Sequence, residues 1–182
     1  LLVLPVRSDK FQFFRAVCPE LVKDMLKSWE YFGFQSDGDL KEAFEYVAGI
    51  RVSDTPKVLL AEGELRDFSI ENWYFADTVK AVDSEEQQKL AKAEAVFGKN
   101  LVVVDIDSFK ALCKKLPVIA RNQLENGISQ NLFYEEVVPR ESRFYTFIMS
   151  PQENNWMDAK TRLLDLQNKR VQIGANATIG YG

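Results

Sequence analysis

The segment NLVVVDIDSFKALCKKL (residues 100–116) changes its pattern halfway along its length. Its first half, NLVVVDID (100–107), is the apolar, β-branched run that is typical of a buried strand. Its second half, SFKALCKKL (108–116), is a helical pattern, and Asp107 or Ser108 is expected to cap it. The segment therefore predicts a strand that leads directly into a helix, so the domain mixes both kinds of element.

Similar capping, turn and periodicity signals predict further elements on both sides of this segment. Glu62-Gly63 is expected to form a bulge or turn, while Ser84 and Gly98 are expected to cap the two ends of one helix. Strands are expected at residues 1–6, 57–70, 132–138, 142–149 and 170–173, and helices at 19–29, 40–49, 84–98 and 155–169. Because these elements alternate without regular βαβ spacing, an α+β fold with an antiparallel sheet is predicted.

Composition limits the kind of protein. The chain has 182 residues, 46% of them hydrophobic, which is enough for one folded domain with a core. No apolar run approaches the roughly 20 residues of a membrane span, so we expect no membrane partner and a cytoplasmic location. The net charge of −4 counts against a free-standing nucleic-acid binder, although the acidic excess lies in residues 1–119.

The chain contains no histidine, and its two cysteines, Cys18 and Cys113, are far apart. The absence of histidine excludes Ser-His-Asp and Cys-His catalysis, as well as the usual zinc sites. Any chemistry must use carboxylates, lysine, tyrosine or a hard metal ion held by oxygen ligands. The cysteines are expected to be reduced packing residues.

Two pairs of carboxylates are candidates for such chemistry. If Asp105 and Asp107 both lie on a strand, they share one face and could hold Mg²⁺; the alternative is a strand that ends in a helix cap. Glu135 and Glu136 are neighbours on a strand and point to opposite faces, so one is expected in solvent and the other near Arg140 or Arg143. A capping role is favoured for the aspartates, and no metal ligand is assigned.

The chain ends in VQIGANATIGYG (171–182), where an apolar strand runs into three glycines. The spacing is neither the GxGxxG of a dinucleotide-binding helix nor a P-loop. By spacing alone this end is a turn or a strand bulge. Another polar stretch, NQLENGISQN (122–131), lies between apolar segments and predicts the tip of a projecting hairpin.

Several segments together resemble, in order, the middle and C-terminal parts of the Cmr4 family, which are RAMP proteins of the Cas7 backbone group in type III-B CRISPR systems. The most specific are LFYEEVVP (132–139) and QIGANATIGYG (172–182). The others are LLVLPVRS (1–8), AVCPELV (16–22), DIDSFKALCKKLPVIAR (105–121) and the remainder of NLFYEEVVPRESRFYTF (131–147). The resemblance covers essentially the whole chain, and residues 33–98 add little to it.

The resemblance implies a single RAMP domain over residues 1–182, with a ferredoxin-like (RRM-like) palm, inserted helices and a thumb hairpin at 121–134. The family's first strand is expected to precede this chain, which we therefore expect to be a piece of a longer protein. The glycine-rich loop is expected to lie close to an RNA backbone, and Asn126-Gly127-Ile128 to form a flexible tip with an apolar wedge. The RNA contacts expected are Arg7, Ser8, Arg121, Asn122, Asn126, Gly127, Ile128, Arg140, Arg143, Gly174, Asn176 and Gly180.

The function implied is that of a backbone subunit which binds crRNA and target RNA in a Cmr complex. Its partners would be other Cmr subunits and further copies of itself, stacked head to tail. The full-length family cleaves guide-paired RNA with Mg²⁺ or a similar divalent cation, but no residue here can be assigned as catalytic, so enzyme activity stays open. One alternative is a non-catalytic RAMP scaffold, and another is an unrelated α+β interaction domain.

Overall fold

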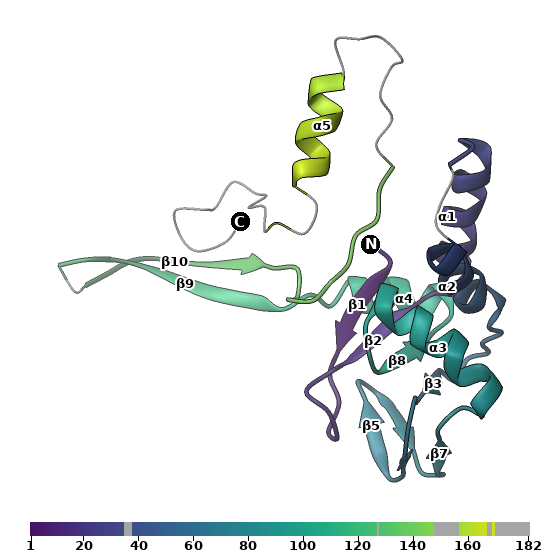
Figure 1. Ribbon diagram of the computed structural model, residues 1–182. Coiled ribbons are helices and arrows are strands. Elements are labelled where there is room, and N and C mark those ends of the chain that lie inside the picture. Colours follow the sequence, from purple (N-terminus) through teal and green to yellow (C-terminus); the bar gives the residue numbers. More distant parts are fainter. Residues whose placement is uncertain (35–37, 127, 148–156, 167–168, 170–182) are drawn as a thin grey trace. The chain divides into compact units, whose positions relative to one another are not determined.

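The computed structural model describes residues 1–34, 38–126, 128–147, 157–166 and 169 (Figure 1). The chain divides into two compact units, residues 1–145 and 146–182, which are described separately. Of the described elements, the first unit holds the strands and all helices but one. The second holds α5 (Met157–Asp165), which lies within the helix predicted at 155–169. The final strand and the glycine-rich segment, predicted within 170–182, lie outside the described residues.

A four-stranded sheet forms the centre of the first unit. Its strands are β1 (Val3–Val6), β2 (Phe14–Val17), β8 (Leu101–Val103) and β3 (Lys57–Leu59), in the order β1-β2-β8-β3. The two outer pairings are antiparallel, but β2 and β8 run parallel. The predicted α+β class is therefore confirmed, whereas the predicted antiparallel sheet is mixed. A parallel pair needs a long crossover connection, and here helices lie in the chain between β2 and β8.

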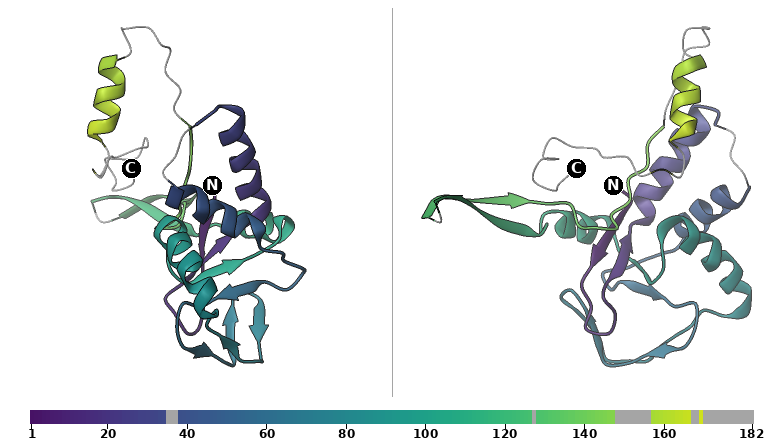
Figure 2. Two further views of the ribbon diagram at one scale, coloured as in Figure 1. Left: turned by 45° about the vertical axis from the view of Figure 1, so that its right-hand side comes forward. Right: turned by 60° about the vertical axis from the view of Figure 1, so that its left-hand side comes forward.

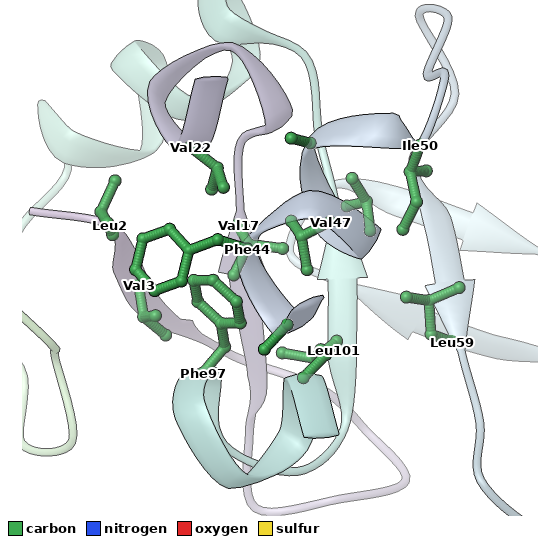
Figure 3. Close-up of a cluster of buried hydrophobic side chains, with 14 of the residues drawn as sticks. Leu2, Val3, Val17, Val22, Phe44, Val47, Ile50, Leu59, Phe97 and Leu101 are labelled. Atoms are coloured by element: carbon green, nitrogen blue, oxygen red, sulfur yellow. The ribbon is translucent and has the colours of Figure 1, made fainter. Parts of the chain in front are cut away.

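Helices and small hairpins cover the two faces of this sheet. The helices are α1 (Pro19–Tyr31), α2 (Gly38–Gly49), α3 (Ser84–Phe97) and α4 (Ile106–Cys113). Neighbouring residues of a strand point to opposite faces. Val3 of β1 accordingly packs in one core with Phe44 of α2 and Phe97 of α3 (Figure 3), while Leu4 packs in a second core with Phe109 of α4.

The single strand predicted at 57–70 is wrong, because this segment forms three short strands. They are β3, β4 (Glu64–Leu65) and β5 (Phe68–Ile70); β4 pairs with β7 (Val79–Lys80) and β5 with β6 (Trp73–Phe75). Positive φ angles at Gly63 (73°) and Asp67 (48°) turn the chain between them. The predicted turn at Glu62-Gly63 thus separates two strands instead of bending one.

A long hairpin follows α4. Strands β9 (Val118–Glu125) and β10 (Ile128–Glu136) pair in antiparallel register, with an irregularity between Ser129 and Asn131. The ribbon extends away from the four-stranded sheet (Figures 1 and 2). The predicted hairpin is therefore present, and Asn126 adopts a positive φ of 51° at its turn.

The segment after the hairpin differs from the strand predicted at 142–149. In its described part, residues 142–147, only Arg143 makes a bridge, which pairs with Val3 of β1. Tyr145 instead packs against Phe44 and Phe97, and its hydroxyl donates a hydrogen bond of 2.5 Å to the Val96 carbonyl. Tyr145, one of the aromatic residues that suggested a strand, therefore packs against α2 and α3 instead, while Phe144 is 62% exposed. None of the helices in the described part of the chain is long and apolar enough to cross a membrane.

Candidate nucleic-acid interface

A groove lies where the end of β1, the end of α4 and the base of the hairpin meet. Its volume is about 610 Å³. Three segments far apart in the sequence build it: residues 4–7 with 12 and 13, residues 112–118, and residues 139–141, with Glu71 from the β5–β6 turn. The structure therefore brings together Arg7 and Arg140, two of the residues predicted to contact RNA.

The charges in this groove favour an anion. Its cations are Arg7, Lys115 and Arg140, and its acids are Glu71 and Glu141. Both acids are engaged: Glu71 Oε1 accepts the Arg7 backbone N–H at 2.6 Å, and Glu141 Oε2 lies 3.3 Å from Arg15 Nη2. Among the described residues, none of the ion pairs includes a cation of the groove. The groove is therefore left with a local positive charge although the whole chain is acidic.

The walls of the groove are largely apolar. They are formed by aliphatic side chains, proline rings and one aromatic ring, from Leu112, Leu116, Pro117, Val118, Pro139 and Phe13. The Arg15 guanidinium carbon lies 4.8 Å from the centroid of the Phe13 ring and so helps to hold this ring in place. Apolar and aromatic surface beside cations is the combination that binds single-stranded nucleic acid, in which bases need stacking partners and phosphates need positive charge.

Arg121 lies on the hairpin and has a structural partner. Its Nε is 2.7 Å from Oε2 of Glu135 on the neighbouring strand, and both side chains are mostly buried. In the register Arg121 is opposite Phe133, so Arg121 and Glu135 are diagonal neighbours on one face of the ribbon. The prediction that Glu135 or Glu136 meets Arg140 or Arg143 is therefore wrong, while Glu136 is exposed as expected of one of the two.

The other face of the hairpin is open to solvent. Asn122 is exposed there, and so are Leu132 (54% exposed) and Tyr134 (67%). At the tip, Asn126 is exposed and Ile128 is 65% exposed, so the predicted apolar wedge is accessible. Gly127, Gly174, Asn176 and Gly180 lie outside the described residues.

The structure places Arg143 and Ser8 outside the groove lining. Arg143 pairs with Val3 through its backbone, and its Nη1 donates to the carbonyls of Ala95 and Val96 in the last turn of α3. A cation at the C-terminal end of a helix is stabilised by the unpaired carbonyls and by the helix dipole. Ser8 forms a bridge to Ile70, and its hydroxyl accepts the Lys10 backbone N–H at 3.2 Å.

Asp105 caps α4, where Asp107 or Ser108 was predicted to do so. One oxygen of its carboxylate accepts the backbone N–H groups of Asp107 and Ser108, both at 2.9 Å. Burial alone would raise the pKa of Asp105, but hydrogen bonds from Ser108 and Asp107 outweigh it and lower the pKa. Because Asp107 lies inside the helix and 3.9 Å from Lys110, the two aspartates do not share a strand face.

The described residues contain no group of three or more acidic, cysteine or histidine side chains that could hold a metal ion. Both cysteines are free, and burial raises the pKa of the Cys18 thiol to about 11, so Cys18 is an inert packing residue.

Lys115 and Phe13 line the groove but were not among the predicted contacts. A signal for Lys115 was available, because the pair Lys114-Lys115 ends the helix that leads into the hairpin. No local signal marked Phe13, which lies in the loop before β2 and reaches the groove only through folding.

Comparison with protein-family models finds no match. Among curated proteins, the chain is similar to the CRISPR system Cmr endoribonuclease Cmr4 of Pyrococcus furiosus, with 25% identity over 192 residues. That alignment covers 100% of this chain and 64% of the relative. The chain therefore spans slightly less than two thirds of the length of this curated relative.

Two solved structures share the fold along the whole chain. One is a type III-B Cmr-beta complex bound to cognate target RNA, with a TM-score of 0.70, 17% identity and 65% of that chain covered. The other is oligomeric Cmr4 from Pyrococcus furiosus, with a TM-score of 0.57, 21% identity and 67% covered. Over its full length this chain thus resembles the type III-B Cmr4 (Cas7) proteins, as its motifs predicted.

Proposed function

We propose that this chain is the RNA-binding part of a backbone subunit in a type III-B Cmr effector complex. The observation that carries the proposal is the groove in which Arg7, Lys115 and Arg140 line apolar walls without carboxylate partners among the described residues. In this proposal the cations bind phosphates of crRNA, and base pairing rather than the protein selects the sequence. The relative of highest TM-score given above belongs to a complex bound to target RNA.

The four-stranded sheet is the proposed palm and the β9–β10 hairpin the proposed thumb. An antiparallel–parallel–antiparallel pairing, with helices in the chain between the parallel strands, is compatible with a ferredoxin-like palm. The exposed Ile128 at the hairpin tip can act as a wedge between bases. Other Cmr subunits and head-to-tail copies of the chain are the proposed protein partners, and the cytoplasm is the expected location.

Target cleavage, with a divalent cation, belongs to the proposal only for the complete subunit. A non-catalytic scaffold is the second candidate. It is favoured by the engagement of both acids of the groove: Glu71 holds the Arg7 amide, and Glu141 pairs with Arg15. Cleavage of guide-paired RNA by the purified complete subunit with Mg²⁺ would decide between the two.

The test of RNA binding is fluorescence anisotropy with labelled single-stranded RNA and DNA of the same sequence, over a series of salt concentrations. Log affinity falls as log salt concentration rises, and replacing one phosphate-binding arginine should make this negative slope less steep by about 0.7. We expect this for Arg7→Gln and Arg140→Gln. Arg66→Gln is the matched control, because Arg66 lies outside the groove and 3.7 Å from Asp67.

Equal slopes for Arg140→Gln, Arg66→Gln and the unmodified protein would show that the groove does not bind phosphates. Absence of RNA binding at low salt, in a sample whose circular dichroism shows a folded protein, would refute RNA binding by this chain.

A further inference from the structure

A second, smaller hollow adjoins the groove, between α4 and the β5–β6 turn, and is lined by Ser108, Ala111 and Asn72 among others. Its volume is about 140 Å³. The two hollows share three lining residues, Glu71, Leu112 and Lys115. A ligand that passes over Lys115 therefore comes within reach of both hollows.

The β5–β6 hairpin supplies an aromatic ring to the second hollow. Ile70 pairs directly with Trp73, so residues 71 and 72 form the turn and Trp73 follows it at once. Trp73 is half-buried: its indole packs against the core that contains Phe68 and Phe109, and it also lines the hollow. An indole that is supported by the core and also faces a hollow is a rigid stacking surface.

The cations that line the two hollows favour a ligand with negative charge. Lys115 is the cation that they share, and Arg7 and Arg140 lie farther along in the groove. Glu71 is the acid that both hollows share, and its carboxylate is already engaged by the Arg7 backbone N–H. Next to it, the exposed Asn72 carries an amide that can both donate and accept hydrogen bonds.

We propose that the second hollow is a base-binding subsite, in which a base of single-stranded RNA stacks on Trp73 while the adjoining phosphate binds Lys115. This inference rests on the proposed function, because the same strand occupies the groove. Stacking on an aromatic ring tolerates every base, so the subsite adds affinity and places the strand without selecting its sequence. RNA would thus cross the C-terminal end of α4, with bases held on both sides of Lys115.

The first experiment observes Trp73 directly. The chain has three tryptophans, so Trp29→Phe and Trp156→Phe together leave Trp73 as the sole indole. A single-stranded RNA oligonucleotide is titrated while the anisotropy of a label on the RNA and the tryptophan fluorescence are recorded in the same sample. We expect Trp73 fluorescence to be quenched with the same midpoint as the rise in anisotropy.

The second experiment compares two neighbouring lysines. Lys115→Gln should make the negative slope of log RNA affinity against log salt concentration less steep by about 0.7. Lys114→Gln removes the same charge from a residue that lines neither hollow, so it should leave the slope unchanged. Trp73→Leu should weaken binding about 5- to 150-fold, the loss expected for one stacked base, whereas Trp73→Phe should retain much of the affinity.

The results separate the failure of the subsite from the failure of RNA binding itself. Salt-dependent RNA binding that leaves Trp73 fluorescence unchanged would overturn the subsite and leave the proposed function standing. Equal salt slopes for Lys115→Gln and Lys114→Gln would overturn the path over α4. Absence of RNA binding by anisotropy would overturn the proposed function, and the subsite with it. If Trp73→Leu does not fold, the quenching experiment still decides.

Discussion

Replacing Gly98 with alanine should destabilise the protein through backbone strain and through the displacement of Arg15. Gly98 ends α3 with φ 95° and ψ 167°, a conformation that only glycine adopts readily. A Cβ atom there would lie 2.4 Å from both Cδ and Nε of Arg15. The Arg15 side chain is only 13% exposed, and its Nη1 donates to the Lys99 carbonyl at 2.6 Å, so it cannot move away without loss.

The magnitude follows from these two effects. Backbone strain at such a position costs about 1–3 kcal/mol, and losing a hydrogen bond of a charged group costs about 1.5–3 kcal/mol. We therefore expect Gly98→Ala to lower the free energy of unfolding by about 2.5–6 kcal/mol, measured by urea denaturation. Gly63→Ala is the matched control, because Gly63 also has a positive φ (73°) but a Cβ atom there would meet no other atom within 4 Å, so strain alone of about 1–2 kcal/mol is expected.

A double-mutant cycle isolates the contact with Arg15. In an Arg15→Ala background the collision is gone, so Gly98→Ala should then cost only the backbone strain of about 1–3 kcal/mol. An equal cost of Gly98→Ala in both backgrounds would refute the argument that Arg15 requires glycine at this position.

Three further changes test other parts of the structure. Arg143→Ala should lower the free energy of unfolding by about 1.5–3 kcal/mol, because it removes a charged donor from the last carbonyls of α3; a cost no greater than that of Arg140→Ala would contradict this role. Asp105→Ala should cost about 1 kcal/mol at neutral pH by removing the cap of α4. Because the pKa of Asp105 is lowered on folding, its contribution is fully present above the unfolded value of about 3.9 and is lost as the pH falls through the folded value, so a pH-independent difference in urea denaturation would exclude the carboxylate as the cap. Phe44→Ala should cost about 3–5 kcal/mol, since Phe44 is 1% exposed and contacts three other rings; thermal unfolding close to that of the unmodified protein would contradict its place in the core.

The elements that the sequence predicted well are those with local signals. Proline at the first turn marks the start of α1 at Pro19, and Gly98 marks the end of α3. The predicted cap at the start of α3 was wrong by one residue, because Asp83 rather than Ser84 accepts the Glu86 backbone N–H. The polar stretch between apolar segments predicted the β9–β10 hairpin. Each of these signals acts through the conformation of a few neighbouring residues, so it can be recognised without knowledge of the rest of the fold.

The errors arose where two structures share one local pattern. An apolar segment interrupted by Gly63 can form one bent strand or two separate strands. Here it forms separate strands, because β4 pairs with β7. The aromatic residues around Tyr145 suit a strand equally well, but contacts with Phe44 and Phe97 place the Tyr145 ring against helices. In both cases the deciding energy comes from segments that are distant in the sequence.

The sequence by itself determined the α+β class, the absence of histidine chemistry, the hairpin and the resemblance to the Cmr4 proteins, because these depend on composition and on local order. Only the tertiary structure decided which charged residues are available to a ligand. Arg121 and Arg143 are held by structural partners, whereas Arg7, Arg140 and Lys115 meet at the groove. The partner of a charged side chain depends on which distant segments the fold brings within a few ångströms of it, and no local pattern contains that information.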